Sequence, residues 1–227
     1  ASLRRDSQRV KQTLEYCLEL NLGGTAVGNS INASDAYIRS VYEELRTITG
    51  FSLKPAANLM SQTSSQTDFC ALSQALVTLT LDASKIANDI RLLARGPKGG
   101  IGEITLEELQ AGSSIMPGKV NPVLPEAVNQ LYFLVSGNNL TIEHAAHAAF
   151  LELANMFPVL ADRLVLSLKL TGEVLLQFAT KCVSTIHVNK ERCRELLEDS
   201  TAYATLLTPA LGYDTVSSIV KESMRSG

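Results

Sequence analysis

The side chains best suited to chemistry lie in residues 112–122, which contain two adjacent serines, a lysine and an asparagine. Ser113 and Ser114 supply hydroxyl groups, while Lys119 and Asn121 supply an ammonium and an amide that can bind a carboxylate or a phosphate. Asparagine is a preferred helix N-cap, and proline is favoured at the first helical position, so Asn121 and the proline after it predict a helix start. Because a helix N-terminus attracts anions, the stretch predicts an anion-binding pocket.

Glycine and proline are frequent around these side chains. Residues 95–119 contain eight of them and no helical stripe of useful length. Long loops inside compact domains are uncommon unless they are functional. Gly112 and Gly118 flank the two serines, which predicts a mobile arm able to close over a bound ligand. The alternative is a solvated loop with ordinary turn glycines.

Helical spacing of apolar residues covers most of the remaining chain. The second helix is expected to begin at Ser34 or Asp35 as the N-cap and to stop at Gly50. No alternation typical of a strand is present. The expected helical segments are 3–22, 34–50, 64–94, 122–149 and 154–185, with shorter pieces in 189–227.

The long segments indicate an all-α fold, an elongated bundle of helices, because 30 helical residues span about 45 Å. The segment 154–185 is apolar around so much of its circumference that we expect it to be buried among other helices. We place a central helical-bundle domain at 1–188, with the loop 95–121 inside it. Residues 189–227 are expected to begin a small helical C-terminal domain.

The composition is that of an ordinary globular protein. The chain has 227 residues, of which 45% are hydrophobic and 19% charged, and a formal net charge of −3. This charge gives no reason to expect nucleic acid or an anionic membrane as a partner. No apolar run approaches the roughly 20 residues of a membrane span, and no signal peptide is visible, so we expect a cytoplasmic location.

Cysteine and histidine do not form a recognisable metal motif. The cysteines are expected to be buried free thiols. His144 and His147 have a spacing that could bind a metal, but we interpret them as structural or surface residues. Asp89 and Arg91 are expected to form an interhelical or solvated pair. The four cysteines are Cys17, Cys70, Cys182 and Cys193.

The pattern Gly-Ser-x-x-Met-x-x-Lys-x-Asn in residues 112–121 resembles the signature of the fumarase/aspartase superfamily. Two flanking segments also resemble that family: the Gly-Gly-Thr-Ala-x-Gly pattern within 21–28, and residues 85–97. The similarity extends over essentially the whole chain. A signature with matched flanks on both sides is a specific signal, unlike a lone glycine motif.

The resemblance implies an anti elimination that cleaves a C–N or C–O bond and releases fumarate. Ser113 maps to the general base that removes the proton from Cβ. Lys119 and Asn121 map to groups that bind the substrate carboxylate, and Ser114, next to the base, is expected to shape the loop and to contact substrate. Glu126 maps to a carboxylate that pairs with a histidine from another segment.

The resemblance also implies a homotetramer whose active sites combine residues of three subunits. Family members have roughly twice this length, and their Gly-x-Thr-His-type and Ser-Ser-Asn-type motifs do not occur in this sequence. The chain also begins on Ala1 inside a helical pattern. We therefore expect it to be a fragment that is inactive alone. No catalytic cofactor or metal is implied, although some members are activated by a divalent cation at a separate site.

Residues 123–130 and the Gln110-Ala111 pair resemble the aspartate ammonia-lyases of the superfamily. This predicts a carbon–nitrogen lyase that eliminates ammonia from L-aspartate. One alternative is a fumarate hydratase, a carbon–oxygen lyase that interconverts malate and fumarate. Another is a non-catalytic structural protein, since crystallin-type relatives use the same bundle. Retention of the loop serine, lysine and asparagine favours an enzyme.

Overall fold

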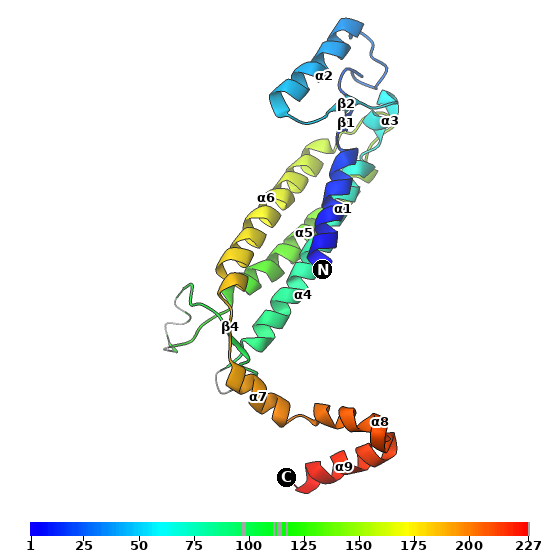
Figure 1. Ribbon diagram of the computed structural model, residues 1–227. Helices are drawn as coiled ribbons and strands as arrows, with labels where there is room; N and C mark the ends of the chain where they lie inside the picture. The colour runs from blue at the N-terminus through cyan, green and yellow to red at the C-terminus, as the bar shows by residue number, and fades with distance from the viewer. Residues whose placement is uncertain (97–98, 111, 113–114, 117, 227) are drawn as a thin grey trace. The chain divides into compact units, whose positions relative to one another are not determined.

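The computed structural model describes residues 1–96, 99–110, 112, 115–116 and 118–226 (Figure 1). Most of these residues are helical, and the strands among them have two residues each, which confirms the predicted all-α class. In chain order the elements are α1 (Ser2–Tyr16), β1 (Glu19–Leu20), α2 (Asp35–Thr49), β2 (Lys54–Pro55), α3 (Leu59–Ser64), α4 (Thr67–Leu93), β3 (Ile104–Thr105), α5 (Val123–His147), α6 (Phe157–Lys181), η1 (Val183–Thr185), β4 (His187–Val188), α7 (Lys190–Glu198), η2 (Thr201–Leu207), α8 (Thr208–Leu211) and α9 (Tyr213–Ser226).

The chain divides into two compact units. The first comprises Ala1–Arg91 and Asn121–Ser184, and the second comprises Leu92–Val120 and Thr185–Gly227. This division differs from the predicted one, which kept the loop 95–121 with the bundle. The cause is a long-range pairing inside the second unit, where β3 and β4 form an antiparallel pair. The Asn189 N–H also donates to the Glu103 carbonyl at 2.8 Å.

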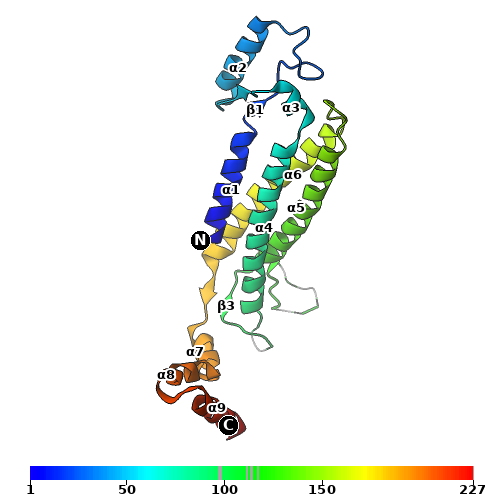
Figure 2. The same cartoon turned by 90° about the vertical axis from the view of Figure 1, so that its right-hand side faces the viewer.

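The core of the first unit lies between long helices. Figures 1 and 2 both show α5 and α6 side by side, with α1 and α4 alongside them. Apolar side chains from α4, α5 and α6 meet in one cluster, and burying such side chains is the main stabilising contribution to a helical bundle. The buried members of this cluster are Leu72, Leu76, Leu131, Val135, Ile142, Ala145, Leu160 and Leu164.

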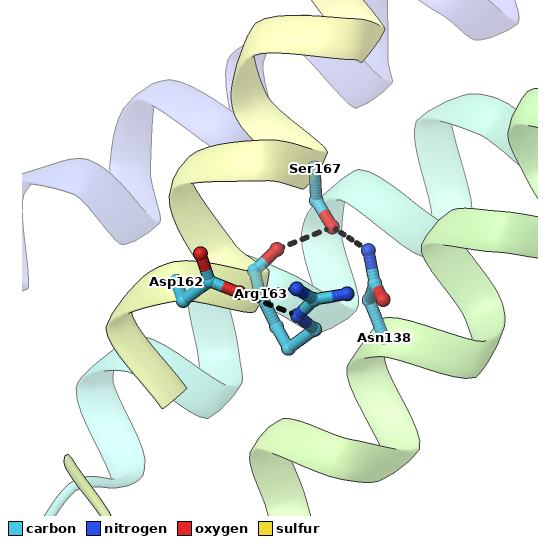
Figure 3. Close-up of polar contacts among 4 residues, drawn as sticks. All are labelled: Asn138, Asp162, Arg163 and Ser167. Carbon is cyan, nitrogen blue, oxygen red and sulfur yellow. Dashed lines mark hydrogen bonds and ion pairs between the residues drawn. The ribbon is translucent and has the colours of Figure 1, made fainter. Parts of the chain in front are cut away.

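A buried polar contact adds to the apolar packing of α5 against α6. Asn138 points from α5 toward Ser167 of α6, and its Nδ2 donates to Ser167 Oγ at 3.0 Å (Figure 3). Ser167 Oγ in turn donates to the Arg163 carbonyl at 2.8 Å. The guanidinium of Arg163 bonds to its neighbour Asp162. Because both buried polar groups have hydrogen-bond partners, neither adds the free-energy cost of an unsatisfied group. The contact therefore limits the rotation of α5 and α6 about their own axes.

One face of α6 remains uncovered in the single chain. Val165 is 63% exposed and Leu176 is 61% exposed, and Phe133 on α5 is 65% exposed. The prediction that the whole segment would be buried among helices is therefore wrong for one chain by itself. The buried face of α6 includes Leu160, Leu164 and Phe178.

The helix α2 has the ends that its sequence predicts. Ser34 is the N-cap, and its side chain accepts a hydrogen bond from the Tyr37 N–H. Gly50 is the C-cap with a φ of 72°, in the left-handed region where glycine is unstrained. Both ends depend on local chemistry, which is why the sequence alone reveals them.

The first helix ends earlier than predicted. It stops at Tyr16 instead of continuing toward Leu22, because Glu19 and Leu20 form β1, a parallel pair with β2. The Lys54 N–H donates to the Leu18 carbonyl at 3.0 Å. A partner that lies so far along the chain leaves no local signal in the sequence.

No helix among the described residues is long and apolar enough to cross a membrane. The four cysteines are thiols and not disulfides, but only Cys182 is fully buried, so the expectation of burial is correct for that residue and too strong for the others. Burial and, to a smaller extent, the nearby Asp68 carboxylate raise the pKa of the Cys17 thiol to about 11. Burial also raises the pKa of the Cys70 and Cys182 thiols. These three thiols are therefore protonated near neutral pH and are poor nucleophiles.

Candidate active site

The loop that carries the predicted catalytic residues closes on itself at its base. A Cβ atom added to Gly112 would lie 1.6 Å from the carbonyl oxygen of Lys119 and 2.5 Å from its carbonyl carbon. No side chain fits in that space, so position 112 requires glycine. Gly112, the residue before Ser113, therefore touches the backbone of Lys119, so the first residue of the signature and its lysine meet within the second unit. Ser113 and Ser114 themselves lie outside the described residues.

Lys119 follows a tight turn. Its N–H donates to the Met116 carbonyl at 3.3 Å, and Gly118 has a φ of 75°. The Lys119 side chain is exposed, and among the described residues its ammonium has no hydrogen-bond or ion-pair partner. A cation without an internal partner is available to bind an anionic ligand.

Replacing Gly112 with alanine is expected to lower kcat/KM of the whole enzyme by about 10²-fold, because the new methyl group must displace the Lys119 backbone and a misplacement of about 1 Å in an active site has an effect of that size. Steady-state kinetics would measure the loss, and circular dichroism would verify the helical content. Gly99→Ala is a matched control, since a Cβ at Gly99 meets no atom within 4 Å. Equal kinetics of the two variants would contradict the close contact at residue 112.

The start of α5 differs by one residue from the prediction. The helix begins at Val123 with Pro122 as its N-cap, instead of beginning at Pro122 with Asn121 as the cap. Pro122 has a ψ of 62°, outside the helical range, and the Val123 N–H donates to the Asn121 carbonyl at 2.9 Å. Asn121 thus precedes the cap, in the first unit, and is half-buried.

Glu126 occupies the first turn of α5. A carboxylate there interacts favourably with the positive end of the helix dipole. The residue is half-buried, and its carboxylate has no hydrogen-bond or ion-pair partner among the described residues. It is therefore free to pair with a group from elsewhere.

A buried amide ties the first turns of α5 to the end of α4. Asn129 Nδ2 donates to the Ser84 carbonyl at 3.1 Å and to Ser84 Oγ at 2.8 Å. Asn129 Oδ1 accepts a hydrogen bond from Arg91 Nη1 at 2.8 Å. Arg91 Nη1 also donates to Asn88 Oδ1 at 3.4 Å. The side chains of Ser84, Asn88 and Arg91 thus form one polar network with α5.

A groove of about 560 Å³ lies beside this network, within the first unit. Its polar lining includes Lys85, Asn88 and Arg91 from α4 and Glu126 and Gln130 from α5. Apolar rings and a leucine complete the wall. The groove thus places Glu126 in the same lining as two cationic side chains, Lys85 and Arg91.

The structure corrects the expected partners of Asp89 and Arg91, and it shows that Asn129 and Ser84 join α5 to α4. Asp89 pairs with Lys85 on the same helix, and Arg91 binds an amide, so the proposed Asp89–Arg91 pair is wrong. Sequence reasoning assigned no role to Asn129 or Ser84. The one available signal was a polar residue beside the apolar core positions Val128 and Leu131, where an amide must find a partner when buried.

The described residues contain no group of three or more His, Cys, Asp or Glu side chains that could hold a metal ion. His144 and His147 lie in the last turn of α5, and both are exposed. The described part of the chain thus gives no location for the divalent cation that the resemblance allows.

The sequence profile of a family described as Lyase matches residues 1–137. An aspartate ammonia-lyase from Pseudomonas aeruginosa is 43% identical over 227 residues, which is 100% of this chain and 48% of the relative. One from a Bacillus species is 40% identical over 225 residues, 99% of this chain and 48% of the relative. The chain thus spans about half the length of the curated relatives it matches.

Solved structures of similar proteins have the same fold. A class II fumarase from Schistosoma mansoni matches with a TM-score of 0.93 and 30% identity, over 98% of this chain and 50% of that chain. A fumarate lyase:delta crystallin from Brucella melitensis, bound to cobalt, matches with a TM-score of 0.92 and 43% identity, over 99% of this chain and 49% of that chain.

Proposed function

Because this chain belongs to the Lyase family, within the fumarase/aspartase superfamily, we propose that the whole protein eliminates ammonia from L-aspartate to give fumarate. The observation that carries the proposal is the identity of 40–43% to aspartate ammonia-lyases over 99–100% of this chain. The close approach of Gly112 to Lys119 supports it, since the residue before the proposed base lies against the backbone of the proposed carboxylate ligand.

In the proposed reaction Ser113 removes a proton from Cβ of the substrate. The electrons of that C–H bond first build up on the neighbouring carboxylate as a dianionic aci-carboxylate. They then form the C=C bond while the C–N bond breaks and ammonia leaves from the opposite face. Lys119 and Asn121 bind the carboxylate that carries the extra charge, because preorganised donors stabilise charge that develops during a reaction. Ser114 is proposed to contact the substrate from the loop.

A serine hydroxyl is a weak base unless its surroundings favour the alkoxide. Lys119, backbone N–H donors and exclusion of water by the closed loop are the features proposed to provide this. The glycines at 112 and 118 allow the turns that such a loop requires, and Gly118 has a φ of 75°. Glu126 is proposed to support the reaction by pairing with a histidine from another segment.

A second candidate activity is the hydration of fumarate to malate. The similarity to the class II fumarase from Schistosoma mansoni favours it, with 30% identity and a TM-score of 0.93. Both reactions use a Cβ proton and a dianionic intermediate, so the same loop residues serve either one. The higher identity to aspartate ammonia-lyases favours ammonia as the leaving group.

We further propose that the whole protein assembles as a homotetramer. The uncovered faces of α5 and α6 support this, because Phe133, Val165 and Leu176 are each more than 60% exposed in the single chain. Monomeric proteins rarely leave large contiguous apolar patches in water. A second copy of this chain is the proposed cover, and sedimentation of the whole protein tests it.

The proposed elimination requires proton transfer and ion pairing only, so no catalytic cofactor is proposed. We also propose that the whole protein is cytoplasmic.

A substrate panel tests the function. The whole protein is expected to form fumarate from L-aspartate, measured by ultraviolet absorbance, with a much lower rate from L-malate. The 227-residue chain alone is expected to be inactive, because the other two active-site motifs do not occur in its sequence. Fumarate formed from L-malate but not from L-aspartate would establish the fumarase alternative. Robust turnover by the isolated chain would refute the proposed division of the active site.

A further inference from the structure

Asn129 ties α5 to α4 with every hydrogen-bonding group of its side chain. It is only 6% exposed. Its amide nitrogen donates twice to Ser84, and its oxygen accepts from Arg91. A buried polar group that loses its partner is unfavourable, so this network resists rotation of α5 about its own axis. The orientation of the first turns of α5 therefore depends on the end of α4.

The direction of the helices places Glu126 near the end of α4. Asn129 pairs with Ser84, whereas Asn139, farther along α5, donates to Gln74, which lies earlier in α4. The two helices therefore run in opposite directions. A step from Asn129 back to Glu126 is about one helical turn on the same face, toward the C-terminal end of α4.

Arg91 lies near the same end of α4, and part of its guanidinium makes no hydrogen bond to the described residues. Its Nη1 atom makes both of its hydrogen bonds, to Asn129 and Asn88, while Nε and Nη2 have no partner among the described residues. Glu126 lines the same groove with its carboxylate also unpaired. An arginine fork and a carboxylate that face one groove form a favourable pair when they meet.

The groove lining contains two further ionisable side chains, Lys85 and Tyr132. Lys85 lines the groove but is paired with Asp89, and its side chain is largely exposed. Tyr132 contributes a phenol hydroxyl, which can donate or accept a hydrogen bond. Arg91 is thus the cation of the groove lining that has no carboxylate partner among the described residues.

We propose that Arg91 is a positioning residue for Glu126: the buried Asn129 fixes its guanidinium, which holds the Glu126 carboxylate in one orientation at the head of α5. This inference rests on the proposed function, in which Glu126 pairs with a histidine during proton transfer. A carboxylate held by a fixed cation loses less freedom when it meets that histidine. The role is distinct from substrate binding, which Lys119 and Asn121 are proposed to provide.

The first part of the test uses the whole protein and three substitutions. Arg91→Met is expected to lower kcat roughly 10- to 10²-fold while KM changes less than about twofold, because the interaction acts on proton transfer and not on the bound carboxylate. Arg91→Lys keeps the charge without the planar fork and is expected to restore part of the loss. Arg39→Met, at an exposed position of α2, is a matched control and should behave as the wild type.

A double substitution separates positioning from a purely structural role. Glu126→Gln removes the group that Arg91 is proposed to hold, so adding Arg91→Met to it should lower kcat no further. If the two losses instead multiply, Arg91 acts independently of Glu126 and the inference is overturned. A kcat of Arg91→Met equal to that of the wild type overturns it as well.

These outcomes differ from a failure of the proposed function. A wild-type protein that forms no fumarate from either L-aspartate or L-malate rejects the lyase function itself. A wild-type protein that turns over, together with an unaffected Arg91→Met variant, rejects only the role of Arg91. Thermal unfolding of each variant shows whether a lost activity comes from a lost fold.

Discussion

Ser113→Ala in the whole enzyme is expected to lower kcat by about 10²- to 10⁴-fold, the range typical for loss of a general acid or base. The methyl group cannot accept the Cβ proton, so the step that begins the elimination loses its base. The KM for substrate should change far less than kcat, since carboxylate binding is assigned to Lys119 and Asn121. Fumarate absorbance under saturating substrate measures the effect.

A matched control separates chemistry from folding. Ser40→Ala removes a hydroxyl from the exposed face of α2, where it bonds only to its own helix at Tyr37. That variant should retain wild-type kinetics. Turnover by Ser113→Ala at the wild-type rate would mean that another group removes the proton, and the mechanism proposed for the loop would be wrong.

Lys119→Met is the second large effect that we expect. It removes an ammonium that has no partner among the described residues, and it should lower kcat/KM by about 10²- to 10³-fold, as loss of one charge-stabilising donor does. Both binding and turnover should suffer, because the carboxylate gains negative charge as the proton leaves. Steady-state kinetics over a wide range of substrate concentration separates the two contributions.

Lys119→Arg serves as the conservative companion, since it keeps the charge in a different geometry. It should retain more activity than Lys119→Met. Lys11→Met, at an exposed site of α1, controls for the removal of one positive charge from the protein. If Lys119→Met binds and converts substrate like the Lys11 variant, the lysine has no part in carboxylate recognition.

Local chemistry explains which parts of the fold were predictable from the sequence. Ser34 and Gly50 bound α2 as expected, because a cap needs only the few residues around it. The end of α1 and the grouping of 92–120 with the C-terminal residues were not predicted. Both depend on strand pairs between residues far apart in sequence, such as Glu19 with Lys54.

The candidate site also has features that the sequence predicts and contacts that only the folded chain shows. The proposed roles of the serines, Lys119, Asn121 and Glu126 were predicted from residue types and from a family signature, without geometry. The contact of Gly112 with Lys119 required the folded loop, although the glycine itself was part of the signature. The bond between Arg91 and Asn129 joins two helices, and sequence spacing within one helix carries no information about such a partner.

The pairing of β3 with β4 constrains how related proteins could be recombined. Residues 187–188 form β4, which pairs with β3 ahead of the signature. Nearby, Arg192 Nε donates to the Ile101 carbonyl at 3.1 Å. In a hybrid that took residues 92–120 from one parent and 185–227 from another, the paired segments would come from two different proteins and their contacts could be lost. Breakpoints after residues 91, 120 and 184 would transfer both segments as a single module and keep these bonds intact.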